Sequence, residues 1–521
     1  MNKKTILFLA ILALVALPTM AMGAVSAPTT PGAVEFSLGG YIKMETDWDS
    51  TQMNKNMVSP VFRNNDPSGQ HGRLKMTANS SRFNFTMKGP KVFGAQITGF
   101  LEFDCDAAGN AVGQGDLVTT FRMRHAFFRL NWPETELLMG QYFGMFSEFC
   151  PEGAQDGSMQ FVGSAVQRPP QIRLTQKFLG TYTLAAAIVG PTNMYDSRAA
   201  AWISANAAPA AGAVGGVTNL PGETSETPQL QVKAAYEKDL WGKAAFYGTP
   251  RGFVAQVAYA WQRTRYRPGD IAAHQTFGDN GYQALGAAMF GNQGAVGQVQ
   301  NNQQYLNPWI VQGTLFIPVL ATTTANLAGT ASLTAQWYVG EGLDFVGEGL
   351  ASQGSYLVFQ NKGQLPGAGA LGGPITNFYD RKLNKRYGGY VQAQYYFTNQ
   401  WFTNFVWGMS KSYDVTRDRA ADTVSPASNP EGYRIAAPAD LINLWQSFNI
   451  TLWYRPIQAL KFGLQYSYDM TTYFQRTQTA VAAGGALGTA IANPAATAIT
   501  APGGPGVTNT GENHRIMFAG F

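Results

Sequence analysis

Hydrophobic and polar residues alternate with a period of two along many segments of about ten residues in this chain. In residues 36–48, hydrophobic side chains fall on one face, whereas Lys43 and Glu45 fall on the other. Residues 441–454 and 460–470 repeat the pattern. Strands of this length with one apolar face are typical of transmembrane β-barrels, whose outer surface meets lipid. The pattern therefore predicts an all-β transmembrane fold.

The composition separates this fold from a soluble β-sandwich, whose strands also alternate. Charged residues make up 13% of the 521 residues, against about 25% in typical soluble proteins. Aromatic residues account for another 13%. The mean hydropathy of −0.13 is too low for a bundle of membrane helices. These values exclude an ordinary soluble enzyme and a helical membrane protein, and they favour apolar surface that is spread along alternating strands.

The connections between the alternating segments are short and long in turn, as in outer-membrane barrels with short periplasmic turns and longer extracellular loops. The short connections lie near residues 89–94, 132–136, 179–181, 239–250, 319–329, 399–400 and 455–458. The long connections lie near residues 49–79, 105–119, 147–167, 191–227, 264–305, 351–385, 415–440 and 475–512. The sequence therefore predicts an antiparallel up-and-down barrel of about sixteen strands, within a range of about fourteen to eighteen, if residues 331–350 form one long strand.

Residues 1–27 have the features of a secretory signal, with a positively charged start, an apolar run and small residues near its end. The apolar run is shorter than the roughly 20 residues that a membrane-spanning helix needs. We expect cleavage within residues 23–27, which removes about residues 1–24. Residues 25–521 would then form a single barrel domain in the bacterial outer membrane.

Charge and ligand-forming residues exclude several other classes of function. The formal net charge of +5 is too small for a nucleic-acid-binding surface. The chain has two cysteines and four histidines, and their spacing matches no haem-attachment or zinc motif. No histidine stands in a recognisable catalytic pattern with a serine or an acid. We therefore expect a protein that is not an enzyme and that holds no cofactor and no metal.

The region 82–146 resembles the Gram-negative outer-membrane porin superfamily. The matching segments are Arg82-Phe83-Asn84-Phe85, Phe93-Gly94-Ala95-Gln96-Ile97, Phe121-Arg122-Met123-Arg124-His125-Ala126-Phe127 and Leu138-Met139-Gly140-Gln141-Tyr142-Phe143. They look like the second to fifth strands of general-diffusion porins, and the dicarboxylate-type trimeric porins are similar here. The barrel architecture extends this resemblance over the whole chain after the signal.

Membership of this family would imply a homotrimer of barrels in outer-membrane lipid, each with a water-filled pore for small solutes. The third extracellular loop, here residues 147–167, would fold inward and narrow the pore. The last strand ends in Phe521 and resembles the signal that such barrels present to the barrel-assembly machinery.

A pore selects solutes by its width and by the charges that line its narrowest ring. The alternation predicts a basic wall on the first six strands, formed by Lys43, Arg82, Arg122, Arg124, Arg173 and Lys177. The constriction loop would supply the acidic side of the pore, with at least one of Glu148, Glu152 and Asp156 facing this wall. Glu102 and Asp104 also point inward, where pairing with arginines would weaken a preference for anions.

The two cysteines offer a further constraint on the loop. Cys105 closes the third strand, and Cys150 lies in the constriction loop. A disulfide in the oxidising periplasm would pin the loop to the wall. Two thiols without a bond are the alternative, because sequence does not give the separation of the two Cα atoms.

These features predict a porin for passive diffusion of small hydrophilic solutes and ions, with a preference for anions or carboxylates. A barrel that serves as a scaffold or conduit for a partner protein, such as an adhesin or an electron carrier, is one alternative. A substrate-specific uptake channel is another, and inward-facing Trp445 and Trp453 would suit stacking of sugars. Whether a loop fills the lumen distinguishes these functions, because a conduit for a partner protein needs a wide lumen without an inserted loop.

Overall fold

The computed structural model describes residues 25–26, 34–51, 53, 60–61, 64, 71–106, 121–154, 161–192, 194–195, 219–220, 225–266, 304–347, 349–350, 355–361, 377–413, 433–435, 442–473 and 510–521. The predicted signal peptide, residues 1–24, lies outside the described residues, and so does Asp156.

The described residues form one large antiparallel sheet of 19 strands. Its strands are β1 (Val25–Ser26), β2 (Glu35–Tyr41), β3 (Met44–Asp49), β4 (Arg73–Thr77), β5 (Arg82–Val92), β6 (Ala95–Asp104), β7 (Arg122–Asn131), β8 (Thr135–Gln141), β9 (Pro170–Phe178), β10 (Tyr182–Val189), β13 (Gln229–Lys238), β16 (Phe253–Trp261), β19 (Trp309–Leu320), β20 (Ala331–Glu341), β23 (Lys385–Tyr396), β24 (Trp401–Ser412), β26 (Ile442–Ile457), β27 (Leu460–Tyr473) and β28 (Thr510–Gly520). The all-β, up-and-down prediction is therefore confirmed.

The remaining strands form small separate sheets in the connections. These strands are β11 (Met194–Tyr195), β12 (Asn219–Leu220), β14 (Ala244–Phe246), β15 (Thr249–Arg251), β17 (Thr264–Tyr266), β18 (Gln304–Leu306), β21 (Ser355–Asn361), β22 (Asn377–Leu383) and β25 (Tyr433–Ile435). The hairpin of β14 and β15 lies in the predicted short connection 239–250.

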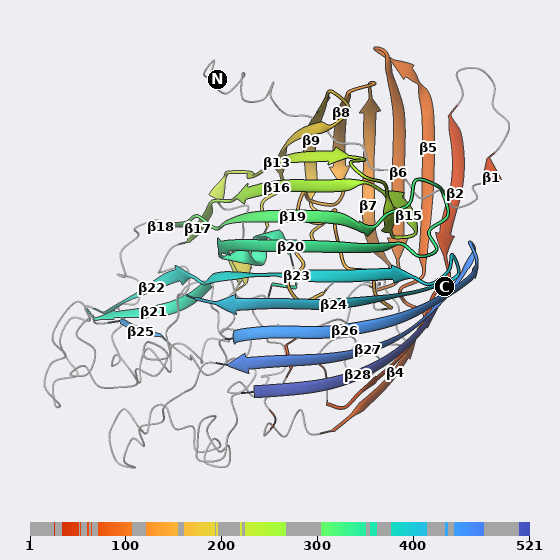
Figure 1. Ribbon diagram of the computed structural model, residues 1–521. Helices are drawn as coiled ribbons and strands as arrows, with labels where there is room; N and C mark the ends of the chain where they lie inside the picture. The colour runs from red at the N-terminus through yellow and green to blue at the C-terminus, as the bar shows by residue number, and fades with distance from the viewer. Residues whose placement is uncertain are drawn as a thin grey trace, which may run out of the picture.

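From β5 to β28, strands of the large sheet pair with their neighbours in chain order, whereas β2 pairs with β5. Figure 1 shows β13 to β28 lying side by side across the front of the molecule. The last strand, β28, pairs with β3, in a register that runs from Arg515 opposite Asp49 to Gly520 opposite Met44. This pairing places the C-terminal strand beside the N-terminal ones. The predicted count of sixteen strands is not confirmed by these segments, because β2 and β3, and likewise β4 and β5, are separate strands.

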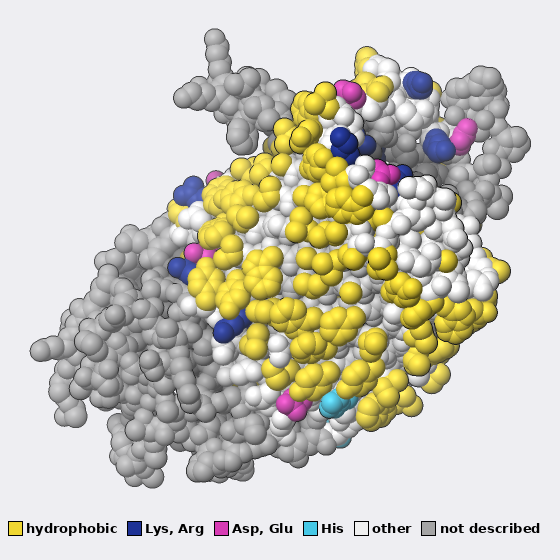
Figure 2. Space-filling view, viewed as in Figure 1, with side chains coloured by type: hydrophobic (Ala, Val, Ile, Leu, Met, Phe, Trp, Pro, Cys, Tyr) yellow, Lys and Arg dark blue, Asp and Glu magenta, His cyan; other side chains and the backbone are white. Residues whose placement is uncertain are grey.

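In the large sheet, hydrophobic side chains face outward and polar side chains are buried, which is the reverse of the arrangement in a soluble protein. On β24, β26 and β27, hydrophobic residues such as Phe405, Ile450 and Leu464 are about half exposed, whereas the intervening Asn404 and Gln465 are at most 1% exposed. Figure 2 shows hydrophobic side chains covering the outer face of these strands, with charged side chains gathered towards the strand ends. This arrangement suits a sheet whose outer face meets lipid. We call the face with the buried polar side chains the inner face.

The prediction that residues 331–350 form one strand is wrong for the second half of this segment, because β20 ends at Glu341. Gly342 adopts a left-handed conformation with φ of 65°, and the 3₁₀-helix η4 (Leu343–Val346) follows. A residue with a side chain rarely adopts such a φ, so glycine allows the chain to leave the strand here. All four residues of η4 are buried.

No helix in the described ranges is long and apolar enough to span a membrane.

Bulges change the direction of side chains at several points along the sheet. The pairing of β26 with β27 shifts between Ile442 and Leu444. Ile442 is therefore buried at 3% exposure on the inner face, although the alternation placed it with the outward residues. One inserted residue moves every side chain beyond it to the opposite face.

Candidate functional site: an inserted loop and a basic wall

The connection between β8 and β9 is folded against the inner face of the sheet. The carbonyl oxygen of Phe146 accepts hydrogen bonds from Gln312 on β19 (3.1 Å) and Gln336 on β20 (3.4 Å). Further along, the amide of Ala154 donates to Gln465 Oε1 on β27 (2.8 Å). The loop therefore extends along the inner face from β19 to β27. We call its described residues, 142–154 and 161–169, the inserted loop.

Glu148 holds the first part of the inserted loop. Its carboxylate forms ion pairs with Lys233 on β13 and with Arg251 on β15, the latter at 3.5 Å. Burial by itself would raise the pKa of Glu148, but the charges of Lys233 and Arg251 outweigh it and lower the pKa from 4.5 to about 2. Glu148 therefore stays ionised at every physiological pH.

Glu152 holds the second part of the inserted loop. Its carboxylate accepts hydrogen bonds from Lys461 Nζ on β27 (2.5 Å) and from Gln394 Nε2 on β23 (2.8 Å). Its backbone amide donates to Gln392 Oε1 (2.7 Å), and its carbonyl oxygen accepts from Asn404 Nδ2. Four side chains from three strands thus fix one loop residue.

In the described part of the chain, neither Glu148 nor Glu152 binds a residue of the predicted basic wall. Glu148 is bound to β13 and β15, and Glu152 to β23, β24 and β27. Buried carboxylates need compensating cations, and these cations are supplied by strands that the basic-wall prediction did not include. Glu148 and Glu152 are therefore bound elsewhere, and the third candidate, Asp156, lies outside the described residues.

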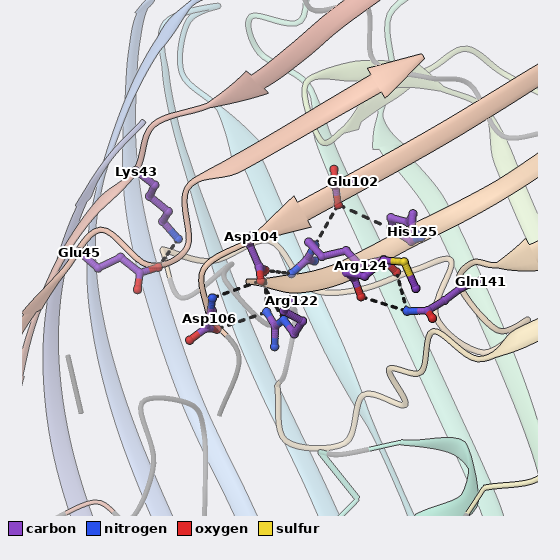
Figure 3. A network of polar contacts seen from close by, with 10 residues as sticks. Lys43, Glu45, Glu102, Asp104, Asp106, Arg122, Arg124, His125 and Gln141 are labelled. Carbon is purple, nitrogen blue, oxygen red and sulfur yellow. Dashed lines mark hydrogen bonds and ion pairs between the residues drawn. The ribbon is translucent and has the colours of Figure 1, made fainter. Parts of the chain in front are cut away.

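Three predicted basic residues do come together on neighbouring strands. Arg82 on β5 lies opposite Asp104 on β6, which lies opposite Arg122 on β7. Arg122 Nη2 is 2.6 Å from Asp104 Oδ2, and Arg124 Nη1 is 2.5 Å from the same oxygen. Figure 3 shows the side chains of Arg122 and Arg124 converging on Asp104.

Two further carboxylates join this cluster. Arg124 Nε lies 2.9 Å from Glu102 Oε1, and Arg122 Nη2 lies 3.3 Å from Asp106 Oδ2. The sequence analysis expected Glu102 and Asp104 to pair with arginines, and both do. The wall is therefore a mixed network of charges.

A bulge between β6 and β7 decides which basic residues point inward. The register shifts after Glu102, which pairs with His125, whereas the next residue, Phe103, pairs with Met123. Arg124 and His125 are consequently both buried, and Arg129 beyond them also turns inward at 7% exposure. The sequence analysis missed Arg129 because strict alternation assigns it to the outer face.

Arg168, at the end of the inserted loop, is a functional candidate that the sequence analysis also missed. Burial, followed by the charges of Arg124, Arg122 and Arg82, holds its pKa well below the ordinary value for arginine. Within the described residues, Arg168 forms no ion pair with a carboxylate, and its guanidinium group lies over the Phe143 ring at 5.7 Å. The loop thus places a cation, and not an acid, near the basic wall.

The other predicted basic residues lie apart from this cluster. Arg173 on β9 is stacked on Tyr142 at 5.2 Å and donates to the carbonyl oxygen of Phe143 at 3.3 Å. Lys177 is exposed at the opposite end of β9. Lys43 pairs with Glu45 at 2.5 Å. The structure therefore divides the predicted basic wall into three separate places.

Cys105 and Cys150 are both thiols, so the disulfide that the sequence left open is absent from the structure. Cys150 is buried at 1% exposure, and its Sγ lies 3.2 Å from the carbonyl oxygen of Ser147. The loop is held by ion pairs and hydrogen bonds instead. Within the described ranges, no group of three or more His, Cys, Asp or Glu side chains could hold a metal ion.

Two other segments support the inserted loop from the inner face. The amide of Gly163 donates to the carbonyl oxygen of Gly349, just after η4 (2.8 Å). On the β14–β15 hairpin, Tyr247 donates through its hydroxyl to the carbonyl oxygens of Cys150 (3.0 Å) and Pro151 (2.9 Å). Neither contact has a signal in the sequence, since both depend on the fold of the whole chain.

Trp445 and Trp453 point inward as predicted, but both are nearly fully buried, at 2% and 0% exposure. Trp445 packs with Val162 of the inserted loop, and Trp453 packs in a cluster with Ala154. A stacking surface for sugars has to be accessible to water, and these two rings are covered.

Similarity to known proteins was found only among solved structures. No family model matches the chain, and no curated protein matches it. The outer membrane channel DcaP of Acinetobacter baumannii aligns with a TM-score of 0.56 and 13% identity, over 95% of this chain and 100% of that one.

Two other structures align less well. OprB of Pseudomonas putida gives a TM-score of 0.44 and 9% identity, over 93% of each chain. An anion-selective porin from Comamonas acidovorans gives 0.40 and 9%, over 94% of this chain and 100% of that one. The first alignment supports a shared fold, and these two add nothing to it. The chain therefore has the fold of an outer-membrane channel, as its resemblance to the porin superfamily predicted.

Proposed function

We propose that this protein is an outer-membrane porin, a channel for passive diffusion of small hydrophilic solutes and ions. One observation carries the proposal: the sheet exposes hydrophobic side chains outward and keeps polar side chains on the inner face, against which a charged loop is folded. A lipid-facing wall around a polar interior with an inserted loop is the construction of a selective pore.

The strand pairings support a closed barrel of sixteen strands. The pairing of β28 with β3 brings the last strand beside the first ones, as closure would require. Only Ile42 and Lys43 separate β2 from β3, and only residues 78–81 separate β4 from β5. Counting each of these pairs as one strand and setting aside the two-residue β1 reduces the 19 strands to sixteen.

The path for solutes runs beside β5, β6 and β7. The ion pairs of Glu148 and Glu152 are with β13, β15 and β27, so the inserted loop covers that part of the inner face. Towards β5 to β7, Arg122 keeps 23% of its side chain exposed, against 4% for Glu152. Four guanidinium groups (Arg82, Arg122, Arg124 and Arg168) outnumber the three carboxylates of Glu102, Asp104 and Asp106, which supports a preference for anions, carboxylates included.

The inserted loop also argues against the alternative of a conduit for a partner protein, because a conduit needs an empty lumen. A homotrimer, insertion by the barrel-assembly machinery and export through a cleaved signal peptide complete the proposal. These three features rest on the resemblance to porins and on the sequence of the first residues.

A planar-bilayer recording of the purified protein under a KCl gradient tests the function. We expect discrete current steps that come in threes, with a reversal potential on the anion side. Correctly folded protein that gives no steps would refute the channel. Steps with cation selectivity would keep the channel and refute the anion preference. A current that saturates with one class of solute would favour a substrate-specific uptake channel.

The Glu148 ion pairs predict how the channel responds to acid. The folded pKa of about 2 lies below the unfolded value of 4.5, so this carboxylate contributes its full stabilisation above pH 4.5 and loses it as the pH falls towards 2. We therefore expect the size of the current steps to stay constant from pH 7 to pH 5. Below pH 4.5, the steps should become larger and noisier as the loop loosens. A step size that stays constant as the pH falls from 4.5 towards 2 would contradict the assignment.

A further inference from the structure

The C-terminal residue points inward and not towards lipid. Along β28, outward Ile516 and Phe518 are about half exposed, whereas Met517 and Ala519 are buried on the inner face at no more than 1% exposure. Phe521 continues the inward series, and its ring packs against the cluster that contains Met517 and Ala519. Backbone hydrogen bonds in both directions with Lys461, at 2.8 and 3.2 Å, fix the end of the chain to β27.

The Phe521 ring contacts two cations from different parts of the chain. Lys43 Nζ lies 4.5 Å from the centre of the ring, and Lys461 Nζ lies 5.6 Å from it. Lys461 also lies 3.7 Å above the ring of Trp453, which in turn lies 6.1 Å from the Phe521 ring. Ammonium groups within about 6 Å of an aromatic face are attracted to it, and more strongly where water is excluded.

These same two lysines hold the inserted loop. Lys43 Nζ donates to the carbonyl oxygen of Ala154 (2.7 Å), and Lys461 Nζ lies 2.5 Å from Glu152 Oε1. Each ammonium therefore stands between the terminal ring and the loop. Because a lysine side chain has many rotamers, a ring that restricts both ammonium groups lowers the entropy lost when they bind the loop.

We propose that Phe521 is a positioning residue for the inserted loop: its ring orients Lys43 and Lys461 so that they hold Ala154 and Glu152 across the pore. In this role the end of the chain controls the width of the channel without touching the solute. This inference rests on the proposed channel function only where it is tested by recording ionic current. The position of the loop is also measurable by chemical labelling, which does not depend on conduction.

A thiol-labelling experiment tests the position of the loop directly. With Cys105→Ser as the background, Cys150 is the only thiol and is 1% exposed within the loop. The protein is refolded from urea into detergent micelles, so that no assembly machinery acts on the terminal residue. In Phe521→Ala we expect a charged maleimide to label Cys150 about tenfold faster or more, because the loop opens locally more often. Phe521→Trp, which keeps an aromatic face, should restore the slow rate.

Phe518→Ala is the matched control, because it removes an aromatic ring from the same strand on the outward side. It should leave the labelling rate unchanged. Lys461→Gln is the second variant, since it leaves the C-terminus intact and should also speed labelling. If Phe521→Ala folds and Cys150 stays protected, or if Lys461→Gln does not speed labelling, the proposal is wrong.

The bilayer recording separates this inference from the proposed function. Faster labelling in Phe521→Ala together with larger, noisier current steps supports both. Faster labelling in a protein that conducts in no variant supports the positioning role and refutes the channel. Normal steps and a protected Cys150 in Phe521→Ala keep the channel and refute the positioning role.

Discussion

Replacing Arg168 with glutamate is expected to turn an anion-preferring channel into a cation-preferring one. Within the described residues, Arg168 forms no ion pair with a carboxylate. The neighbouring Arg122 and Arg124 are balanced by the carboxylates of Glu102, Asp104 and Asp106. A unit charge about 4 Å from a passing ion contributes roughly 1 kcal/mol in water, and this variant changes the charge by two units. The free energy of a passing ion therefore changes by about 2 kcal/mol, and the ratio of anion to cation permeability should fall by about thirtyfold or more, since 1.4 kcal/mol corresponds to a factor of ten.

The reversal potential under a KCl gradient measures this ratio. Lys177→Glu is the matched control, because it makes the same change of charge at the exposed far end of β9. Exposed charges are screened within about 10 Å at an ionic strength of 0.1 M, so the control should shift the reversal potential much less. Equal shifts in the two variants would mean that net charge, and not the place of Arg168, sets the selectivity. No shift in Arg168→Glu would mean that ions pass elsewhere.

Alternation along the sequence was enough to predict an antiparallel all-β fold and which side chains of the regular stretches point inward. Lys43 and Glu45 are buried, while Phe36 and Leu38 on the same segment are exposed, as their two-residue period requires. The prediction failed where the ladder is irregular. Arg129 turns inward because of the bulge after Glu102, and nothing in the local sequence marks that extra residue.

The direction of the loop acids could not be predicted for a different reason. Glu148 and Glu152 are each paired with a lysine, but Lys233 and Lys461 lie on strands far along the chain. The inward position of Lys233 can be predicted from the sequence, since Gln229, Gln231 and Lys233 alternate with apolar residues. Its partner depends on where the loop crosses the sheet, and that crossing is set by packing between distant segments.

A tight contact on β24 shows how the loop is held sterically. A Cβ atom on Gly408 would lie 1.8 Å from the carbonyl oxygen of Val162, whereas ordinary contacts begin at about 3.4 Å. Glycine thus lets the inserted loop lie directly on the strand. The neighbouring strand offers a similar approach, since Gly163 of the loop lies beside the carbonyl oxygen of Gly389. Contacts of this kind are lost as soon as one methyl group is added.

Gly408→Ala is therefore expected to displace the inserted loop while the barrel itself persists. The carbonyl oxygen of Val162 would have to move by about 1.6 Å, the difference between 1.8 and 3.4 Å, and overpacking of this kind costs roughly 1–3 kcal/mol. The loop can yield more easily than a strand bonded on both sides, so the single-channel conductance should rise. Gly313→Ala on β19 is the control, because a Cβ there meets nothing within 4 Å and the conductance should stay the same. Unchanged conductance in folded Gly408→Ala would show that the narrowest part of the pore lies away from Val162.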